Sequence, residues 1–366
     1  MAVLLLQVSA IAGDPASPAS PWVDHESASV RLISAVNASG NPEDVTGKFP
    51  APLTMGLEFQ LAEHWKIYWR SPGDAGFPPL PDWSASENVM AVHMAWPAPV
   101  RFSILGFETL GYTDEVVFPL SVTPKIASEP IRLAGRIDYL ICSDICVPET
   151  VNLVLDIPAG EAEPSAFAHI INKYSARVPG DGKNHGLSID RLSLDATDPA
   201  KPVIVVSARS LLGLSFDNPD VYLEGPDGTG YGAPATTLSD DGFLAELRVP
   251  VFPALGGDGK LITVLENARF TVTLADGDRA AEKLFEAITL GASSQSVLPE
   301  TPAETPTEIP ASTSSVSTLM SILGIAFLGG LILNLMPCVL PVLSIKLLGV
   351  INHSGSEART VRLSFL

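Results

Sequence analysis

Cys142 and Cys146 have the spacing and the setting that disulfide chemistry requires. They lie in the segment Asp138-Tyr-Leu-Ile-Cys-Ser-Asp-Ile-Cys-Val-Pro-Glu-Thr150, where one strand-like run ends and the next begins. Three residues separate them, so a tight hairpin would bring the two Cβ atoms within bonding range. We therefore expect this pair to be able to close into a disulfide.

The residues alone leave three interpretations of this pair open. A redox role is favoured, because closing so small a loop adds little stability and strain in a small ring makes a disulfide easier to reduce. A structural bond is the second interpretation. Metal ligation is the third, but zinc would need two further ligands and no histidine lies nearby in the sequence. Asp144, inside the loop, would disfavour a neighbouring thiolate, or it is simply a turn former.

The third cysteine, Cys338, stands in Asn334-Leu-Met-Pro-Cys-Val-Leu-Pro-Val-Leu-Ser344. Prolines on both sides would interrupt helical hydrogen bonding and expose the thiol to a cavity. We interpret Cys338 as a functional thiol whose partner lies beyond Leu366. The alternative is a small apolar residue in a kinked helix.

A copper site is suggested by the Met and His residues of Asn88-Val-Met-Ala-Val-His-Met94. On a regular strand, however, Met90 and Met94 would share a face that His93 does not. We therefore predict no metal site there.

Short strands with turn residues between them would position Cys142 and Cys146. Strand-like runs are expected at 29–36, 53–61, 65–70, 89–96, 115–122, 131–141 and 150–157. Alternation is clearest in the last run, where Val151, Leu153, Leu155 and Ile157 would face one core. These runs predict an immunoglobulin-like sandwich over 26–160. A connecting helix at 161–180, with Ser165 as its N-cap, leads to a second, cysteine-free sandwich at 185–290.

The remaining segments are expected to anchor these domains outside a membrane. Residues 1–12 are similar to a signal peptide, a buried strand being the alternative. Residues 291–317 are rich in Pro, Thr, Ser, Glu and Ala and predict a disordered linker. Residues 318–350 contain an uncharged run long enough to cross a roughly 30 Å hydrocarbon core. The predicted fold class is all-β: two tandem immunoglobulin-like β-sandwiches, a disordered linker and one transmembrane helix.

The charged residues predict how the chain is oriented in the membrane, and they argue against nucleic acid as a partner. The net charge of -19 argues against binding to nucleic acid. Lys346, Arg359 and Arg362 follow the hydrophobic run, so the tail at 351–366 is expected in the cytoplasm. A single helix that ends in this way is expected of a truncated polytopic protein.

Two motifs resemble a known family. The segment Tyr139-Leu-Ile-Cys-Ser-Asp-Ile-Cys-Val-Pro-Glu-Thr150 resembles the redox loop of the DsbD N-terminal domain, and Met336-Pro-Cys-Val-Leu-Pro-Val342 resembles the first membrane cysteine motif of the DsbD and CcdA transmembrane domain. The front end, with His64-Trp-Lys-Ile-Tyr-Trp-Arg-Ser-Pro-Gly-Asp-Ala-Gly76, looks closer to the ScsB branch, which is linked to suppression of copper sensitivity. Compared with DsbD, the cysteine spacing is shorter and the second sandwich is extra.

This resemblance implies a protein-disulfide reductase of the bacterial inner membrane, with both sandwiches in the periplasm. Electrons from cytoplasmic thioredoxin would pass through a membrane cysteine pair that includes Cys338. A thioredoxin-like domain of the full-length protein would pass them on to Cys142 and Cys146. The final acceptors would be periplasmic thioredoxin-like proteins: disulfide isomerases, cytochrome c maturation proteins or a copper-responsive partner. No bound cofactor is needed. The resemblance also implies a cap loop at 101–112, with Leu105 or Phe107 covering the cysteines.

The main rival is a non-catalytic, membrane-anchored immunoglobulin-like module for binding or assembly, in which the bond between Cys142 and Cys146 is permanent. Periplasmic copper binding is a third hypothesis. A redox titration separates the first two, because a permanent bond resists the glutathione range.

Overall fold

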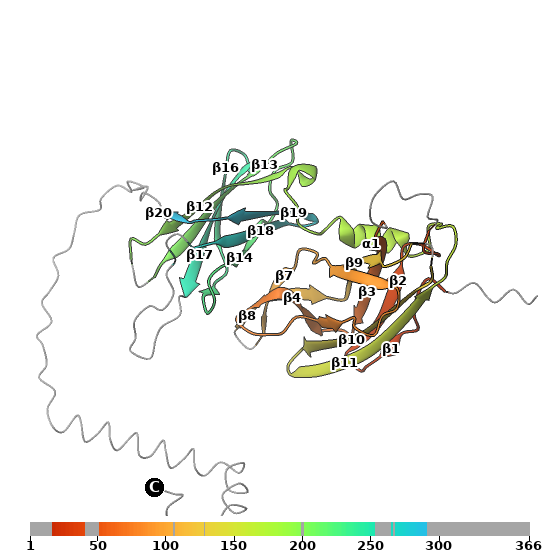
Figure 1. Cartoon of the computed structure of the whole chain (residues 1–366). Coiled ribbons are helices and arrows are strands. Elements are labelled where there is room, and N and C mark those ends of the chain that lie inside the picture. Colours follow the sequence, from red (N-terminus) through yellow and green to blue (C-terminus); the bar gives the residue numbers. More distant parts are fainter. Residues whose placement is uncertain are drawn as a thin grey trace, which may run out of the picture. The chain divides into compact units, whose positions relative to one another are not determined.

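The computed structural model describes residues 17–40, 51–104, 107–127, 129–198, 201–252, 265 and 268–290. These residues form two β domains with antiparallel sheets, both within the compact unit 1–295 (Figure 1). The prediction of a β fold in two domains is confirmed, whereas the domain limits stay predictions. The predicted signal peptide, linker, transmembrane helix and tail, and Cys338 with them, lie outside the described residues. Within the described ranges, no helix is both long and apolar enough to cross a bilayer.

The first domain consists of two sheets. The five-stranded sheet has the order β1-β2-β3-β9-β6, formed by β1 (Val23–Asp24), β2 (Ala28–Ser34), β3 (Leu53–Leu61), β9 (Glu115–Pro124) and β6 (Val89–Met94). The six-stranded sheet has the order β11-β10-β4-β8-β7, with β5 also paired to β10. Its strands are β4 (Lys66–Gly73), β5 (Leu80–Asp82), β7 (Val100–Ile104), β8 (Phe107–Thr113), β10 (Ile131–Cys142) and β11 (Cys146–Ile157).

A single apolar core draws on both sheets of the first domain. Phe118 of β9 is fully buried, and its ring lies edge-on to Phe59, Trp96 and Tyr112 at centroid distances of 5.9, 5.0 and 5.3 Å. Burial of one such side chain contributes roughly 1.5–3 kcal/mol. The core therefore fixes the sheet that carries both cysteines.

The β10–β11 hairpin runs in continuous antiparallel register from Ile131 opposite Ile157 to Cys142 opposite Cys146. The predicted alternation in β11 is confirmed, because the side chains at 151, 153, 155 and 157 are buried and those between them are exposed. β11 starts four residues before the expected Thr150 and includes Pro148. A proline fits there because β11 is an edge strand, in which the backbone N–H groups on the outer side have no hydrogen-bond partner in the sheet.

Helix α1 (Ala168–Ser175) follows the first domain and packs against β9 and β3. Ile171 and Tyr174 are its buried residues. The expected N-cap was wrong: the cap position is Phe167, and it makes no side-chain capping bond. Ser165 lies just before it, where its hydroxyl accepts the N–H of Phe167 at 3.0 Å and donates to the carbonyl of Ser34. The serine thus ties the approach to the helix to β2.

The second domain also has two sheets, preceded by the short helix η2 (Lys183–His185). The six-stranded sheet has the order β15-β17-β13-β12-β20 with β16 on β17, and the three-stranded sheet has the order β14-β18-β19. The strands are β12 (Leu187–Asp195), β13 (Val203–Ser210), β14 (Asp220–Glu224), β15 (Gly230–Tyr231), β16 (Ala235–Ser239), β17 (Leu244–Phe252), β18 (Phe270–Asp276), β19 (Arg279–Phe285) and β20 (Thr289–Leu290). Strands β12 and β20 pair in parallel, whereas the other strand pairs described in this domain are antiparallel.

Strand β6 departs from regular alternation. A bulge between Val89 and Ala91 offsets its register against β9. Met94 packs against the core, whereas Met90 is 52% exposed and His93 is also exposed. The expectation that Met90 and Met94 share a face was therefore wrong. Among the described residues, no cluster of three His, Cys, Asp or Glu side chains could hold a metal ion.

Candidate active site

Cys142 and Cys146 form a disulfide at the tip of the β10–β11 hairpin. The two residues are register partners with Cα atoms 4.1 Å apart. The loop between them is closed by a hydrogen bond of 2.9 Å from the N–H of Ser143 to the carbonyl of Ile145. The strand pairing therefore holds the sulfur atoms together across a three-residue loop.

The two cysteines differ in their access to solvent. Cys142 is completely buried, because β10 lies inside the sheet and pairs with both β11 and β4 at this point. Cys146 begins the edge strand β11 and is exposed, and Ile145 before it is 64% exposed. An incoming thiolate therefore finds the sulfur of Cys146 first.

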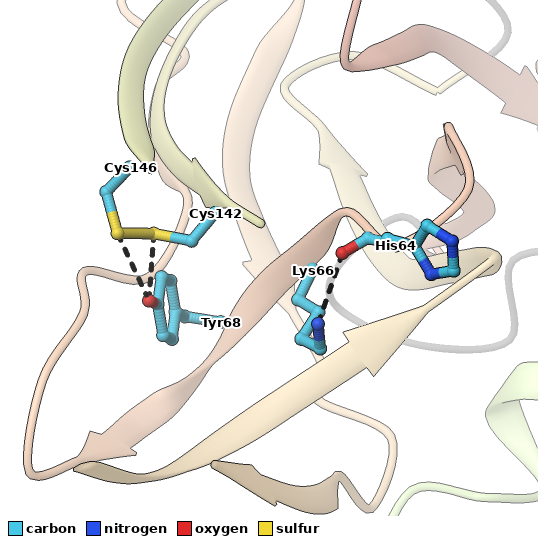
Figure 2. The surroundings of a disulfide bond; sticks show 5 residues. All are labelled: His64, Lys66, Tyr68, Cys142 and Cys146. Atoms are coloured by element: carbon cyan, nitrogen blue, oxygen red, sulfur yellow. Dashed lines mark hydrogen bonds between the residues drawn. A yellow bond between two sulfur atoms is a disulfide. The ribbon is translucent and has the colours of Figure 1, made fainter. Parts of the chain in front are cut away.

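Tyr68 supplies the main polar contact of the disulfide. Its hydroxyl donates to Sγ of Cys142 at 2.9 Å and lies 3.9 Å from Sγ of Cys146 (Figure 2). The ring is buried, and this desolvation raises the pKa of the phenol above its usual value of 10.0. Tyr68 therefore stays protonated at neutral pH and acts as a hydrogen-bond donor to sulfur.

An aromatic side chain packs against Tyr68, and a lysine side chain lies over that second ring. The ring of Phe102, on β7, packs against the ring of Tyr68 with centroids 6.4 Å apart. The ammonium group of Lys66 lies 5.7 Å from the Phe102 ring and donates to the carbonyl of His64 at 3.1 Å. Tyr68 and Cys142 form a small cluster of their own, against which Phe102 and Leu140 pack. The buried side of the disulfide is thus lined by β4, β7 and β10.

A hollow opens beside the loop on the exposed side. It is lined by Glu63, His64, Trp65, Lys66, Ser103, Ser143 and Asp144. Asp144 is exposed, and its modulating role stays a prediction. Phe107 is 52% exposed, and the aromatic ring in contact with Tyr68 is that of Phe102 instead. Phe107 as a covering residue stays a prediction, and Leu105 lies outside the described residues.

Sequence reasoning missed Tyr68, and it placed Phe102 in the expected cap loop at 101–112 without giving it a role. Tyr68 stands 74 residues before Cys142, within the segment 64–76 that served for the resemblance to ScsB. The signal that could have found it is the pairing of β4 with the end of β10, where Lys66 lies opposite Cys142. That pairing belongs to the tertiary structure and has no counterpart in the local pattern.

Replacing Tyr68 with phenylalanine is expected to slow opening of the disulfide about ten-fold. When Cys146 is attacked, Cys142 leaves as a thiolate, and a hydrogen bond to a charged group contributes about 1.5–3 kcal/mol. The substitution keeps the ring and removes the donor. The rate is measured with dithiothreitol, followed by alkylation. In the reduced variant the pKa of Cys142 should rise, which pH-dependent alkylation measures. An unchanged rate and an unchanged pKa would exclude a role for the hydroxyl.

Comparison with known protein families identifies the kind of domain that contains this hairpin. Residues 43–158, which include both cysteines, match the family model described as "Thiol:disulfide interchange protein DsbD, N-terminal". The chain contains a DsbD N-terminal domain. In this DsbD N-terminal domain, the disulfide at the hairpin tip is consistent with thiol:disulfide exchange. A second model, described as "Domain of unknown function (DUF8393)", matches residues 177–289.

A solved structure matches a larger part of the chain than the DsbD N-terminal domain alone. It is the N-terminal periplasmic domain of ScsB from Proteus mirabilis, at 26% identity and a TM-score of 0.56. The match covers 75% of this chain and 100% of that chain. No curated protein matches the chain. The resemblance to the DsbD N-terminal domain and to ScsB is therefore confirmed. The resemblance of residues 336–342 to the membrane cysteine motif stays a prediction.

Proposed function

We propose that this chain is the periplasmic part of a membrane thiol:disulfide reductase that passes electrons to periplasmic thioredoxin-like proteins. The observation that carries the proposal is the asymmetric pair, with Cys146 exposed at a hairpin tip and Cys142 buried against the hydroxyl of Tyr68. The match to the DsbD N-terminal family and to a periplasmic domain of ScsB supports it.

The proposed exchange consists of two displacements at sulfur. In the reduced protein, the Cys146 thiolate attacks a disulfide of the partner, and one partner sulfur leaves as a thiolate. Cys142 then loses its proton and attacks Sγ of Cys146. This step closes the Cys142–Cys146 bond and releases the partner's second thiolate. Two electrons and two protons pass to the partner, and no cofactor takes part.

Reduction of the closed pair follows the reverse route. A donor thiolate attacks the exposed Sγ of Cys146, and Cys142 leaves towards the Tyr68 hydroxyl. We propose that the donor is a thioredoxin-like domain of the full-length protein, which receives electrons from cytoplasmic thioredoxin through a membrane cysteine pair that includes Cys338. The proposed acceptors are disulfide isomerases, cytochrome c maturation proteins or a copper-responsive thioredoxin-like partner.

We further propose an immunoglobulin-like sandwich for each domain and a periplasmic location at the bacterial inner membrane. The two sheets around one core in the first domain support the sandwich. The likeness to a periplasmic domain of ScsB supports the location. In this arrangement the hollow beside the loop and the exposed Ile145 lie where a thioredoxin-like partner would approach.

The test uses the reduced full chain and an oxidised periplasmic thioredoxin-like disulfide isomerase. Mixing should oxidise Cys142 and Cys146 and reduce the isomerase in equal amounts, as measured by alkylation and mass spectrometry. The potential of the pair should lie within the range of roughly -180 to -320 mV, where thioredoxins and glutathione operate.

The rival function, a binding module with a permanent bond, gives the opposite result. The bond would then resist reduction throughout the same range. No exchange with the isomerase, together with such resistance, would exclude the reductase.

A further inference from the structure

Strand β14 of the second domain holds the start of β7 in the first domain. The guanidinium of Arg101 binds the carboxylate of Asp220 through two hydrogen bonds of 2.9 and 3.0 Å. The same guanidinium donates to the carbonyl of Val221 at 3.0 Å. Arg101 and Asp220 are only 15% and 23% exposed, so the pair is less screened by solvent than a surface ion pair.

Tyr222 adds a buried contact between the same strands. Its hydroxyl donates to the carbonyl of Pro99 at 2.9 Å, and its ring packs against Trp69 with centroids 5.9 Å apart. Tyr222 belongs to the core cluster of the first domain although it comes from the second. The apolar core is therefore continuous across the contact.

Strand β4 is held by the second domain in a similar way. Arg70 binds Glu224 of β14 with a closest distance of 2.6 Å, and it also binds Glu282 of β19. All three side chains are between 27% and 29% exposed. Both carboxylates come from the three-stranded sheet of the second domain.

These contacts lie next to the residues that line the buried side of the disulfide. Arg101 precedes Phe102, whose ring packs against Tyr68. Arg70 follows Tyr68 by two residues on β4, and the Tyr68 hydroxyl donates to Cys142. The strands that bear Phe102 and Tyr68 are thus each fixed by a partly buried ion pair with the second domain.

We propose that the second domain is a brace that holds Phe102 against Tyr68 and Cys142, so that Sγ of Cys142 stays closed to reductants and the disulfide opens only through attack on Cys146. Arg101 and Asp220 are its positioning residues. Without their contact, β7 would move more freely, Phe102 would cover the buried side of the disulfide less completely, and Sγ of Cys142 would become a second sulfur open to attack. This inference deepens the proposed function and rests on it for its biological meaning.

The test is the substitution Asp220→Asn in the full chain, which keeps the size of the side chain and removes its charge. Amide hydrogen exchange in β7 should become faster. Reduction of the Cys142–Cys146 bond by dithiothreitol should accelerate on the order of five-fold, as expected if about 1 kcal/mol of constraint is lost. Exchanging the charges, with Arg101→Asp and Asp220→Arg together, should return both rates towards the native values.

The control is Asp190→Asn, which removes a partly exposed ion pair to Arg209 inside the second domain. It should leave both rates unchanged. A native reduction rate in Asp220→Asn would overturn the proposal, as would an equal acceleration in the control. Because dithiothreitol is the reductant, these outcomes do not depend on whether a thioredoxin-like protein exchanges with the chain. A result that refutes the brace is thus distinguishable from a result that refutes the proposed reductase function.

Discussion

Serine at position 146 is expected to abolish disulfide exchange, whereas serine at position 142 is expected to trap the partner. Cys142 is buried and Cys146 is exposed, so only the second can reach a disulfide on another protein. A Cys146→Ser variant retains a thiol that no partner can approach. A Cys142→Ser variant can attack but lacks the thiol that resolves the mixed disulfide.

The two variants serve as controls for each other, because each removes one sulfur from the same pair. The reduced proteins are mixed with the oxidised isomerase and separated without a reducing agent. A covalent complex should accumulate with Cys142→Ser and be absent with Cys146→Ser. A complex through Cys142 instead would show that the hairpin opens before attack, and it would refute the assignment of Cys146 as the attacking thiol.

Gly111→Ala is expected to destabilise the protein by about 1–3 kcal/mol, through overpacking in a strand junction. Gly111 lies on β8 between β4 and β7, opposite both Tyr68 and Val100. A Cβ on this residue would collide with the carbonyl oxygen of Ile67 and lie 3.0 Å from the Cα of Tyr68. Backbone atoms cannot rotate away, so β4 and β8 must separate beside the disulfide.

The matched control is Gly180→Ala, because nothing lies within 4 Å of a Cβ at that residue and its φ is not among the positive values. Its stability should change by less than about 0.5 kcal/mol. Urea unfolding measures both variants, with the midpoint compared at constant slope. Equal midpoints for the two variants would show that the junction of β4, β7 and β8 can expand without cost.

Strands with strong alternation could be predicted from the sequence. β3 has the predicted limits, and β11 buries every second residue as expected. Strands β5, β7 and β8 were not predicted, because their short runs include prolines, glycines and polar residues and obtain their order from neighbouring strands. The bulge in β6 was also missed, since the local pattern contains no sign of it.

The cysteine pair could be predicted because its spacing is local, whereas its surroundings could not. Two cysteines four positions apart define the loop by themselves. The donor to Cys142 depends on β4 pairing with β10, and the cover over Tyr68 depends on β7 pairing with β8. The brace depends further on ion pairs that join residues more than a hundred positions apart, such as Arg101 and Asp220.

Pro148 has a consequence for how other chains can reach the hairpin tip. It lies exposed on the edge strand β11, two residues after Cys146, and it has no N–H to offer. A bare strand of this length would otherwise be a template for intermolecular β-sheet growth and aggregation. The missing donor interrupts such growth next to the reactive sulfur. A protein that docks here must be selected by its side chains rather than by its backbone, and two copies of this domain are discouraged from joining edge to edge.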